Sequence, residues 1–573
     1  MPMSKPLLVQ KRTLTPEQED LAKAFESAGM TRVIARALAM RGVTTVEEAL
    51  GQYRLEPYRE LRDIDTIADK ISDGIIHKER FIVVADYDCD GATACAVAVS
   101  GLKALGADID FVVPNRFIHG YGLTPSVVEV VAPMNPRWII TVDNGIASNA
   151  GVAAAQAKGI GVLVTDHHLP GDVIPPAEAI VNPNHPECTF SSKNLAGVGV
   201  MYYVLAATRE ALKQKGALSP TVPALSAWLD LVALGTVADV VKLDANNRWL
   251  VRQGLRLIRA GHARPGVRAL FEVARRDMSK ACAQDFGFGL GPRINAAGRL
   301  EDMSIGIKCL LSTTLEEARG YAEQLNDINE RRKNIEKEMK ETAWQTIHIE
   351  NQAGRFTRVV FDPSFHEGVI GIVAGRIKEE ENVPVLVFAP AQEEGYLKGS
   401  GRSIPGLHLR DALDLVHKRG QELFYKFGGH AMAAGVTLKA DRLNQFMALF
   451  EQVVQELMEH RLSQKEIWVD EELHFHDIQL ELADEIQDHV WGQAFEEPVF
   501  EGHFKLLEAR LLGMDKQHLK MVVQAGPFEW EAMHFFNSEI PQSPWVRLVY
   551  RLSANEFNGQ RKLNLMVIQK FEA

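Results

Sequence analysis

The stretch Phe81-Ile-Val-Val-Ala-Asp-Tyr-Asp-Cys-Asp-Gly91 decides the fold. Its first half is apolar and β-branched, which is typical of a buried strand, and three acids follow within five residues. The same order occurs twice more, because 138–142 precedes Asp143-Asn144-Gly145 and 161–165 precedes Asp166-His167-His168. Helical segments separate these runs, so the pattern predicts an α/β fold with parallel strands.

The three acidic clusters should meet in space, because ligands of open α/β sheets bind at the carboxyl ends of the strands. Carboxylate oxygens with one or two imidazole nitrogens favour Mg²⁺ or Mn²⁺ over a thiolate-loving metal. A single acid after a strand is more often the N-cap of the next helix. Three such clusters in one series would repel one another unless cations neutralise them. The sequence therefore predicts a metal site at this sheet edge.

Composition sets outer bounds on the protein. A length of 573 residues allows roughly three or four domains, and 46% hydrophobic with 24% charged residues is ordinary for a globular protein. The net charge of −12 means that any nucleic-acid contact must be a local basic groove. The five cysteines form no CxxC pair, which argues against a zinc ribbon and a disulfide framework. We see no signal peptide or membrane span, so we expect a cytoplasmic protein.

A first lobe is expected over residues 51–310, after an N-terminal extension over 1–50. Within this lobe we predict a helix over 91–105, a strand over 108–113 and a helix opened by Thr124-Pro125. The run 230–239 looks buried and carries two acids, Asp230 and Asp239, of which at least one should face the metals. The alternative for either acid is a helix cap.

A single long helix is predicted next, within a connecting segment over 311–350. Thr314 and Glu317 have a capping-box form, and apolar residues follow at helical spacing up to Ile347. About 33 residues would span roughly 50 Å, which suits a strut between two lobes. A coiled-coil dimer is the weaker alternative, because the apolar seam is short and interrupted.

A second lobe is expected over residues 351–460, with strands at 359–361 and 383–388 and a helix at 371–380 between them. Its runs 399–403 and 427–430 are rich in glycine, which lets a backbone approach a ligand and lets its amides hold phosphate oxygens. Each run alone could be an ordinary turn. Together with Arg402 and His430 they indicate a phosphate-binding surface.

The last segment, residues 461–573, contains short strand-like runs at 503–512, 519–524, 531–536 and 546–552. Asn558-Gly559 is a strong hairpin signal, and strands at this spacing suggest a small barrel of the oligonucleotide-binding (OB) type. Phe504 and Trp530 could stack on bases or belong to the core. The alternative is a barrel used only for packing or protein contact. Basic residues that could line its face are Lys505, Arg510, Lys516, Lys520 and Arg561.

Taken in order, the motifs resemble those of the DHH phosphoesterase superfamily, and within it the branch of bacterial single-strand-specific exonucleases. The resemblance rests on the three acidic clusters and on the motifs 235–239, 291–299, 399–403 and 428–430, and it covers nearly the whole chain. It implies a DHH catalytic domain, a connecting helix, a smaller α/β DHH-associated domain and a C-terminal OB barrel. It also implies removal of mononucleotides from the 5′ ends of single-stranded DNA with two Mg²⁺ or Mn²⁺ ions.

Site residues follow from this resemblance. The implied metal ligands are Asp86, Asp88, Asp143, His167 and one acid of the fourth motif, for which Asp239 is favoured over Asp230. His168 would lie beside the scissile phosphate, and Asp143 is a candidate bridging carboxylate. The implied substrate-binding residues are Arg116, Arg293, Arg299, Ser400, Arg402, Gly428, Gly429 and His430. Cys89 stands where Ala is usual, and Ile82 where many members have His.

The implied role is in DNA recombination and repair. The implied partners are single-stranded DNA, a single-strand-binding protein and a recombination helicase, and the enzyme is expected to be a monomer. Two alternatives remain open at this point. One is a phosphodiesterase of short RNA or cyclic dinucleotides, against which the extra barrel argues. The other is a non-enzymatic replication scaffold, against which the retained acids argue.

Overall fold

The computed structural model describes residues 7–115, 118–349, 354–459, 465–513, 515–557 and 560–572. The chain divides into two compact units. One contains 11–298, 302–326 and 468–573, and the other contains 1–10, 299–301 and 327–467. The DHH-like lobe and the barrel therefore belong to one unit.

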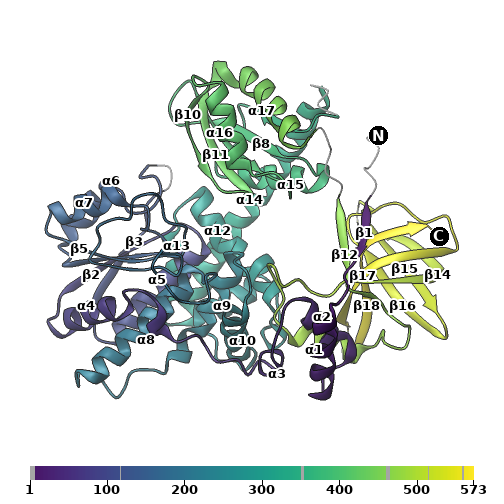
Figure 1. Cartoon of the computed structure of the whole chain (residues 1–573), viewed down its shortest axis with the longest axis horizontal. Helices are drawn as coiled ribbons and strands as arrows, with labels where there is room; N and C mark the ends of the chain where they lie inside the picture. The colour runs from purple at the N-terminus through teal and green to yellow at the C-terminus, as the bar shows by residue number, and fades with distance from the viewer. Residues whose placement is uncertain are drawn as a thin grey trace. The chain divides into compact units, whose positions relative to one another are not determined.

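A five-stranded parallel sheet forms the centre of the larger unit, in the order β3-β2-β4-β5-β6 (Figure 1). Its middle strands are buried throughout, which explains why they read as continuous apolar runs. The sequence placed β4 and β5 correctly to the residue but did not identify β6. The strands are β2 (Arg80–Ala85), β3 (Asp108–Val112), β4 (Trp138–Val142), β5 (Gly161–Thr165) and β6 (Ala179–Val181).

Helices cover both faces of this sheet. On one face α6 (Pro125–Val131) and α7 (Asn149–Ala157) bury Val127, Val128 and Val152 against β2, β4 and β5. On the other face lie α4 (Ile64–Ile76), α5 (Cys89–Ala104) and α8 (Gly197–Gln214) (Figure 1). Thr124 caps α6 through a hydrogen bond from the Val127 amide, as its Thr-Pro start predicted.

A helical layer follows α8. Its helices are α9 (Leu229–Ala238), α10 (Ala245–Arg259), α11 (Pro265–Val273), α12 (Gly291–Leu300) and α13 (Ser304–Leu311). A π-helix, η5 (Asp285–Leu290), runs directly into α12. The predicted long helix is α14 (Leu315–Ile349), and its 35 residues confirm that segment as one helix.

The smaller unit is built on a mixed sheet in the order β10-β11-β9-β8-β7. Its core contains Leu386, Phe388, Leu413, Phe446 and Phe450. The strands are β7 (Arg358–Phe361), β8 (Val385–Pro390), β9 (Tyr396–Arg402), β10 (Phe424–Gly429) and β11 (Ala433–Lys439). The helices are α15 (Ile370–Glu381), α16 (Leu409–Arg419) and α17 (Leu443–Leu457).

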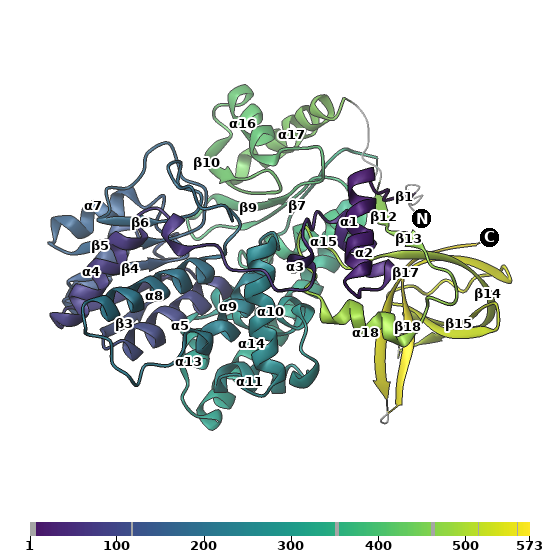
Figure 2. The same ribbon diagram turned by 60° about the horizontal axis from the view of Figure 1, so that its bottom comes forward.

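The C-terminal strands close into a five-stranded barrel, because β14 pairs with both β15 and β17 (Figure 2). Phe504 and Trp530 lie in its core, so the base-stacking role considered for them is not supported. The Asn558-Gly559 turn lies outside the described residues, but the strands on either side pair up to Phe557 and Gln560. The strands are β14 (Phe500–Leu512), β15 (His518–Ala525), β16 (Phe528–His534), β17 (Trp545–Phe557) and β18 (Gln560–Glu572). A short strand β13 (Glu471–Glu472) joins β14, and α18 (Leu480–Asp488) precedes the barrel.

The described part of the segment predicted as an extension, residues 7–50, forms regular secondary structure. It forms β1 (Leu8–Lys11), α1 (Pro16–Ser27), α2 (Arg32–Met40) and α3 (Val46–Ala49), and β1 pairs with β12 (Glu466–Val469). Arg41, just after α2, forms a buried ion pair with Asp470 at 2.6 Å. Among the described residues, no helix has the length and apolar character needed to cross a membrane.

Candidate metal centre

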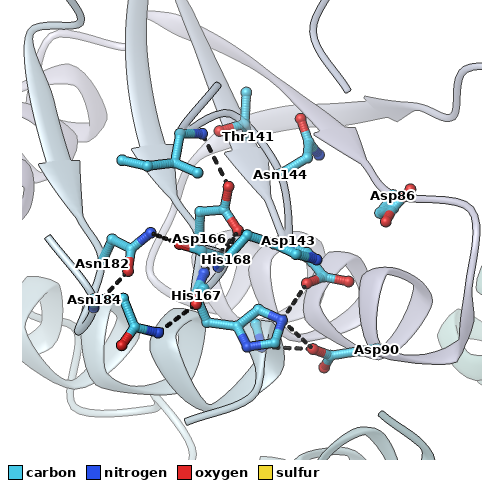
Figure 3. Close-up of polar contacts among 12 residues, drawn as sticks. Asp86, Asp90, Thr141, Asp143, Asn144, Asp166, His167, His168, Asn182 and Asn184 are labelled. Atoms are coloured by element: carbon cyan, nitrogen blue, oxygen red, sulfur yellow. Dashed lines mark hydrogen bonds and ion pairs between the residues drawn. The ribbon is translucent and has the colours of Figure 1, made fainter. Parts of the chain in front are cut away.

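The acidic clusters meet at the carboxyl ends of β2, β4 and β5, as the sheet topology predicts (Figure 3). The ligand atoms of Asp86, Asp88 and Asp143 lie within 4.8 Å of one another. A second group of the same compactness joins Asp90, His167 and Asp239, and a third joins Asp143 to His167 and His168. All five predicted metal ligands are therefore brought together in space.

His167 lies at the centre of this arrangement (Figure 3). Its Nε2 atom is 3.1 Å from Asp143 Oδ1, 3.4 Å from Asp239 Oδ2 and 3.9 Å from Asp90 Oδ2. Burial and the positive charge of neighbouring His168 lower the pKa of His167 to about 4. The imidazole is thus neutral near pH 7, which is the form that binds a metal.

The carboxylates of this cluster repel one another unless a cation neutralises them. Burial and the charge of Asp88 raise the pKa of Asp86 to about 8 and that of Asp90 to about 7. Burial and the charges of Asp90, Asp88 and Asp86 raise the pKa of Asp143 and Asp239 well above the ordinary value. Bound cations would remove this penalty by pairing with the ionised oxygens.

Three buried atoms in the cluster have no hydrogen-bond partner among the described residues: Asp143 Oδ1, His167 Nε2 and Asp239 Oδ2. Buried polar atoms almost always have a hydrogen-bond partner, so these three atoms, which belong to the ligand groups above, suit the binding of cations. Carboxylate oxygens with one imidazole nitrogen suit Mg²⁺ or Mn²⁺. The residues present therefore fit a divalent-metal centre.

Asp239 and Asp230 are separated by the length of α9, and only Asp239 belongs to the cluster. Asp239 is the C-cap residue of α9, next to His167. Asp230 lies at the start of the helix, where it accepts hydrogen bonds from the backbone and side chain of Arg264. The geometry therefore favours Asp239 as the fourth-motif ligand.

Asp90 belongs to the first acidic cluster, but the sequence analysis did not predict it as a site residue. It is the second residue of α5, and its carboxylate accepts hydrogen bonds from the Gly197 and Val198 amides at the start of α8. A side chain at Gly197 would place its Cβ 2.6 Å from Asp143 Cβ, so glycine is needed for α8 to approach the metal centre. Asp90 thus joins the candidate ligands.

Asp166 holds neighbouring residues of the site in place. Its carboxylate accepts hydrogen bonds from the amides of Ile146 at 2.9 Å and His168 at 3.1 Å, and it contacts His168 Nδ1 at 2.8 Å. Burial alone would raise the pKa of Asp166, but the hydrogen bond and charge of His168 lower it below the ordinary value. The sequence predicts no specific role for Asp166. A carboxylate that orients a histidine cannot be distinguished from a metal ligand by its position in the sequence alone.

His168 is held as a protonated side chain at the edge of the cluster. Burial would lower its pKa, but the hydrogen bond and charge of Asp166 raise the pKa of His168 to about 9. Tyr121, which the sequence did not identify, lies beside it, with its Oη 3.4 Å from His168 Nε2. This placement suits a group that donates a hydrogen bond to a phosphate oxygen.

Two backbone positions at the centre are strained. Asp143 has φ 61° and Val240, which directly follows Asp239, also has φ 61°. A β-branched residue in the left-handed region is a genuine outlier, and such outliers concentrate at functional sites. The strain falls on or next to two of the candidate ligands.

Ser400 and Arg402, which were predicted to hold a terminal phosphate, lie in the smaller unit. Arg402 Nη1 contacts Ser400 Oγ at 3.2 Å, and a Cβ at Gly371 would lie 2.9 Å from that Oγ. Gly371 is in the first turn of α15, so Ser400 and Arg402 adjoin a helix N-terminus, which favours anions. Burial lowers the pKa of the Arg402 guanidinium, so an anion would stabilise its charge.

Gly428 lies on the same sheet as this group. Ser400 pairs with Gly435, and Gly435 pairs with Gly428, so the three form one row across β9, β11 and β10. Gly429 has φ 145°, and the exposed His430 follows it. This row of small residues leaves backbone accessible beside Arg402.

The remaining predicted arginines have different surroundings. Arg293 donates to the Gly289 carbonyl at 2.7 Å and to Asn326 Oδ1 at 3.1 Å. Arg299 Nη1 contacts the Gly368 carbonyl at 3.4 Å. Their predicted role in gripping DNA stays a prediction. Arg116 lies outside the described residues.

Comparison with known proteins agrees with this geometry. The model of the DHH family N-terminal domain matches residues 80–236, that of the DHHA1 domain matches 354–456, and that of the RecJ OB domain matches 469–569. The single-stranded-DNA-specific exonuclease RecJ of Salmonella typhimurium is 44% identical over 97% of this chain and 99% of its own length.

Solved structures resemble the whole chain as well. RecJ of Thermus thermophilus in complex with Mn²⁺ has a TM-score of 0.82 at 27% identity and covers 99% of this chain and 80% of its own. Its complex with Mg²⁺ has a TM-score of 0.77 at 25% identity, with 99% and 79% covered. The expected DHH, DHH-associated and OB architecture is confirmed. With 44% identity to a relative that it covers almost completely, the chain belongs to the RecJ family of DHH phosphoesterases.

Proposed function

We propose that this chain is a single-stranded-DNA-specific exonuclease that removes 5′-mononucleotides in the 5′-to-3′ direction with two Mg²⁺ or Mn²⁺ ions. One observation carries the proposal: a chain 44% identical to a single-stranded-DNA-specific exonuclease over its whole length retains a complete, converged set of acids and histidines. A scaffold of the same ancestry would not need buried acids that repel one another. The cofactor assignment is supported by related structures that contain Mn²⁺ or Mg²⁺.

The side chains of the site would have different roles in catalysis. Asp86, Asp88, Asp90, Asp143, His167 and Asp239 would hold the cations, which supply an activated water and charge stabilisation for an in-line displacement. Asp143 belongs to two of the three ligand groups, so it is our candidate for the bridging carboxylate. His168, oriented by Asp166, would donate a hydrogen bond to a non-bridging phosphate oxygen.

The smaller unit would bind the phosphorylated 5′ end of the DNA strand. Ser400, Arg402 and the first turn of α15 form a compact group of donors that suits a terminal phosphate. Gly428, Gly429 and His430 would let the sugar–phosphate backbone lie close to the sheet. Arg116, Arg293 and Arg299 are proposed to contribute further phosphate contacts.

The barrel supports DNA over short RNA or cyclic dinucleotides as the substrate, because a dinucleotide needs no added OB domain. We further propose a role in recombination and repair in the cytoplasm, as a monomer. The proposed partners are a single-strand-binding protein and a recombination helicase.

Labelled substrates test the proposal. A single strand with a 5′ label should release labelled mononucleotide at once, whereas a 3′ label should appear in mononucleotides only at the end of digestion. A blunt duplex and a closed single-stranded circle should resist. Cleavage of the circle, or immediate release of the 3′ label, would contradict the proposed polarity.

A further inference from the structure

The π-helix η5 presents one aromatic ring to solvent. Phe288 is 79% exposed, whereas Phe286 and Leu290 on the same segment are fully buried. An exposed phenylalanine ring leaves apolar area in water, which a bound ligand would cover. π-helical turns are rare and occur frequently at functional sites. The ring is therefore a candidate contact for a ligand.

The segment that carries this ring packs next to the metal centre. A Cβ on Gly287 would lie 3.8 Å from Val237 Cγ1, and one on Gly291 would lie 3.0 Å from Ala238 Cβ. The π-helix thus packs on the last turn of α9, whose next residue is Asp239. A substrate at the cations would extend past this segment.

Hydrogen bonds hold the backbone segment that carries Phe288 in place. Arg293 donates to the Gly289 carbonyl at 2.7 Å, and the Cys282 amide donates to Asp285 Oδ2 at 2.9 Å. A ring on such a support loses little conformational freedom when it binds, which favours stacking.

A basic pocket of about 630 Å³ adjoins the same segment. Asp285 of the π-helix lines it and lies 3.6 Å from Arg276 Nε. Its cationic lining residues are Arg275, Arg276, Lys280 and Arg561, against the acids Asp277 and Asp285, and Arg561 also pairs with Asp484. This excess of positive charge, in a chain of net charge −12, complements a polyanion.

We propose that Phe288 stacks on a base of the single-stranded substrate and that the basic pocket beside it receives backbone phosphates of adjoining nucleotides. An aromatic ring with neighbouring Arg and Lys side chains is the chemistry by which proteins hold single strands without reading their sequence. The inference rests on the proposed nuclease function and adds a binding site to it.

Variants at Phe288 test the stacking. Because the ring is exposed, Phe288→Ala, Phe288→Leu and Phe288→Trp should melt like the wild type. In the full-length protein with EDTA, Ala and Leu should weaken binding of a 5′-phosphorylated single strand about 5- to 20-fold, whereas Trp should preserve it, since stacking needs a π-face.

A series of strands, each with one abasic residue, identifies the stacked base. At one position the missing base should weaken wild-type binding about as much as Phe288→Ala does, and should cost Phe288→Ala nothing further. Equal binding by all variants, or a loss in Phe288→Ala that is the same on every abasic strand, would overturn the stacking role.

Salt dependence tests the pocket. Replacing both exposed residues Arg275 and Lys280 by Ala should reduce the slope of log K against log salt by about 1 to 1.5. Lys103→Ala, at the opposite end of α5 from Asp88, should leave the slope unchanged. An unchanged slope in the double variant would overturn the phosphate role. Failure of the wild type to bind or cut single strands would instead overturn the proposed function itself.

Discussion

Replacing Asp143 by Asn should stabilise the metal-free protein while it abolishes metal binding and cleavage. Asp143 is only 1% exposed, and its ligand oxygen lies within 4.8 Å of oxygens of both Asp86 and Asp88. Asn keeps the shape of the side chain but removes its charge. The repulsion inside the cluster should therefore fall without creating a cavity.

The size of this effect follows from the spacing. Two unit charges 4.8 Å apart repel by about 3.5 kcal/mol at an effective dielectric constant of about 20. Asp143 has two such neighbours, but protonation already relieves part of the repulsion, since burial and the nearby acids raise the pKa of Asp143. We expect a net gain of about 2 kcal/mol at pH 8, which corresponds to a rise in melting temperature of roughly 2–4 °C for a unit of this size.

The effect should depend on pH with a defined sign. A carboxyl group whose pKa is raised on folding destabilises the folded state as pH rises from its unfolded value towards its folded value. Since the pKa of Asp86 is about 8 and that of Asp90 about 7, the metal-free wild type should lose stability between pH 5 and 8. Asp143→Asn should lose less over the same range.

Thermal melting in EDTA and in Mn²⁺ at pH 5.5 and pH 8, together with cleavage of a labelled single strand, measures these quantities. Mn²⁺ should raise the melting temperature of the wild type but hardly that of the variant, and cleavage should fall at least about 1,000-fold. Asp230→Asn is the matched control, because it breaks a buried ion pair with Arg264 and should destabilise the protein. A variant at Asp143 that melts below the wild type in EDTA at pH 8, or that keeps the full Mn²⁺ shift, would refute the reasoning.

Three further predictions concern other parts of the chain. Asp166→Asn replaces one accepting oxygen by an NH2 donor and removes the negative charge beside His168, so kcat should fall about 10- to 100-fold with little change in KM, and an unaltered kcat would contradict this role. Arg402→Ala should reduce the preference for a 5′-phosphate over a 5′-hydroxyl end about tenfold in competition assays, whereas Lys398→Ala on the same strand should not. Burial and nearby arginines lower the pKa of His489 to about 4, so folding excludes a proton that the unfolded chain binds below about pH 6.5. Between pH 7 and pH 5 the wild type should therefore lose about 1–2 kcal/mol more stability than His489→Gln in denaturant titrations.

The elements that sequence predicted best are those with strong local signals. β4 and β5 are nearly continuous apolar runs that end directly before an acid, and the start of α6 is specified by Thr124-Pro125. Because parallel strands end at one edge, the convergence of the three acidic clusters also followed from the sequence. β6 has only three residues, too few for a periodic signal.

Residues whose roles depend on distant partners could not be predicted. Asp90 accepts hydrogen bonds from Gly197 and Val198, more than 100 positions away in the chain. Arg41 pairs with Asp470, and residues 11–50 of the predicted extension belong to the same compact unit as the barrel. No local pattern encodes either contact, because each requires the fold to be known first.

The same contacts explain how a fold can hold so many acids before any cation binds. Asp88 caps α5 by accepting from the Gly91 amide, and Asp90 accepts from two amides at the start of α8, so two helix N-termini face the cluster. Asp166 is satisfied by backbone amides and by His168. These donors offset part of the repulsion, whereas Asp143 Oδ1 and Asp239 Oδ2 accept no hydrogen bond among the described residues. Bound cations would neutralise this remaining repulsion, so metal binding should stabilise the folded protein.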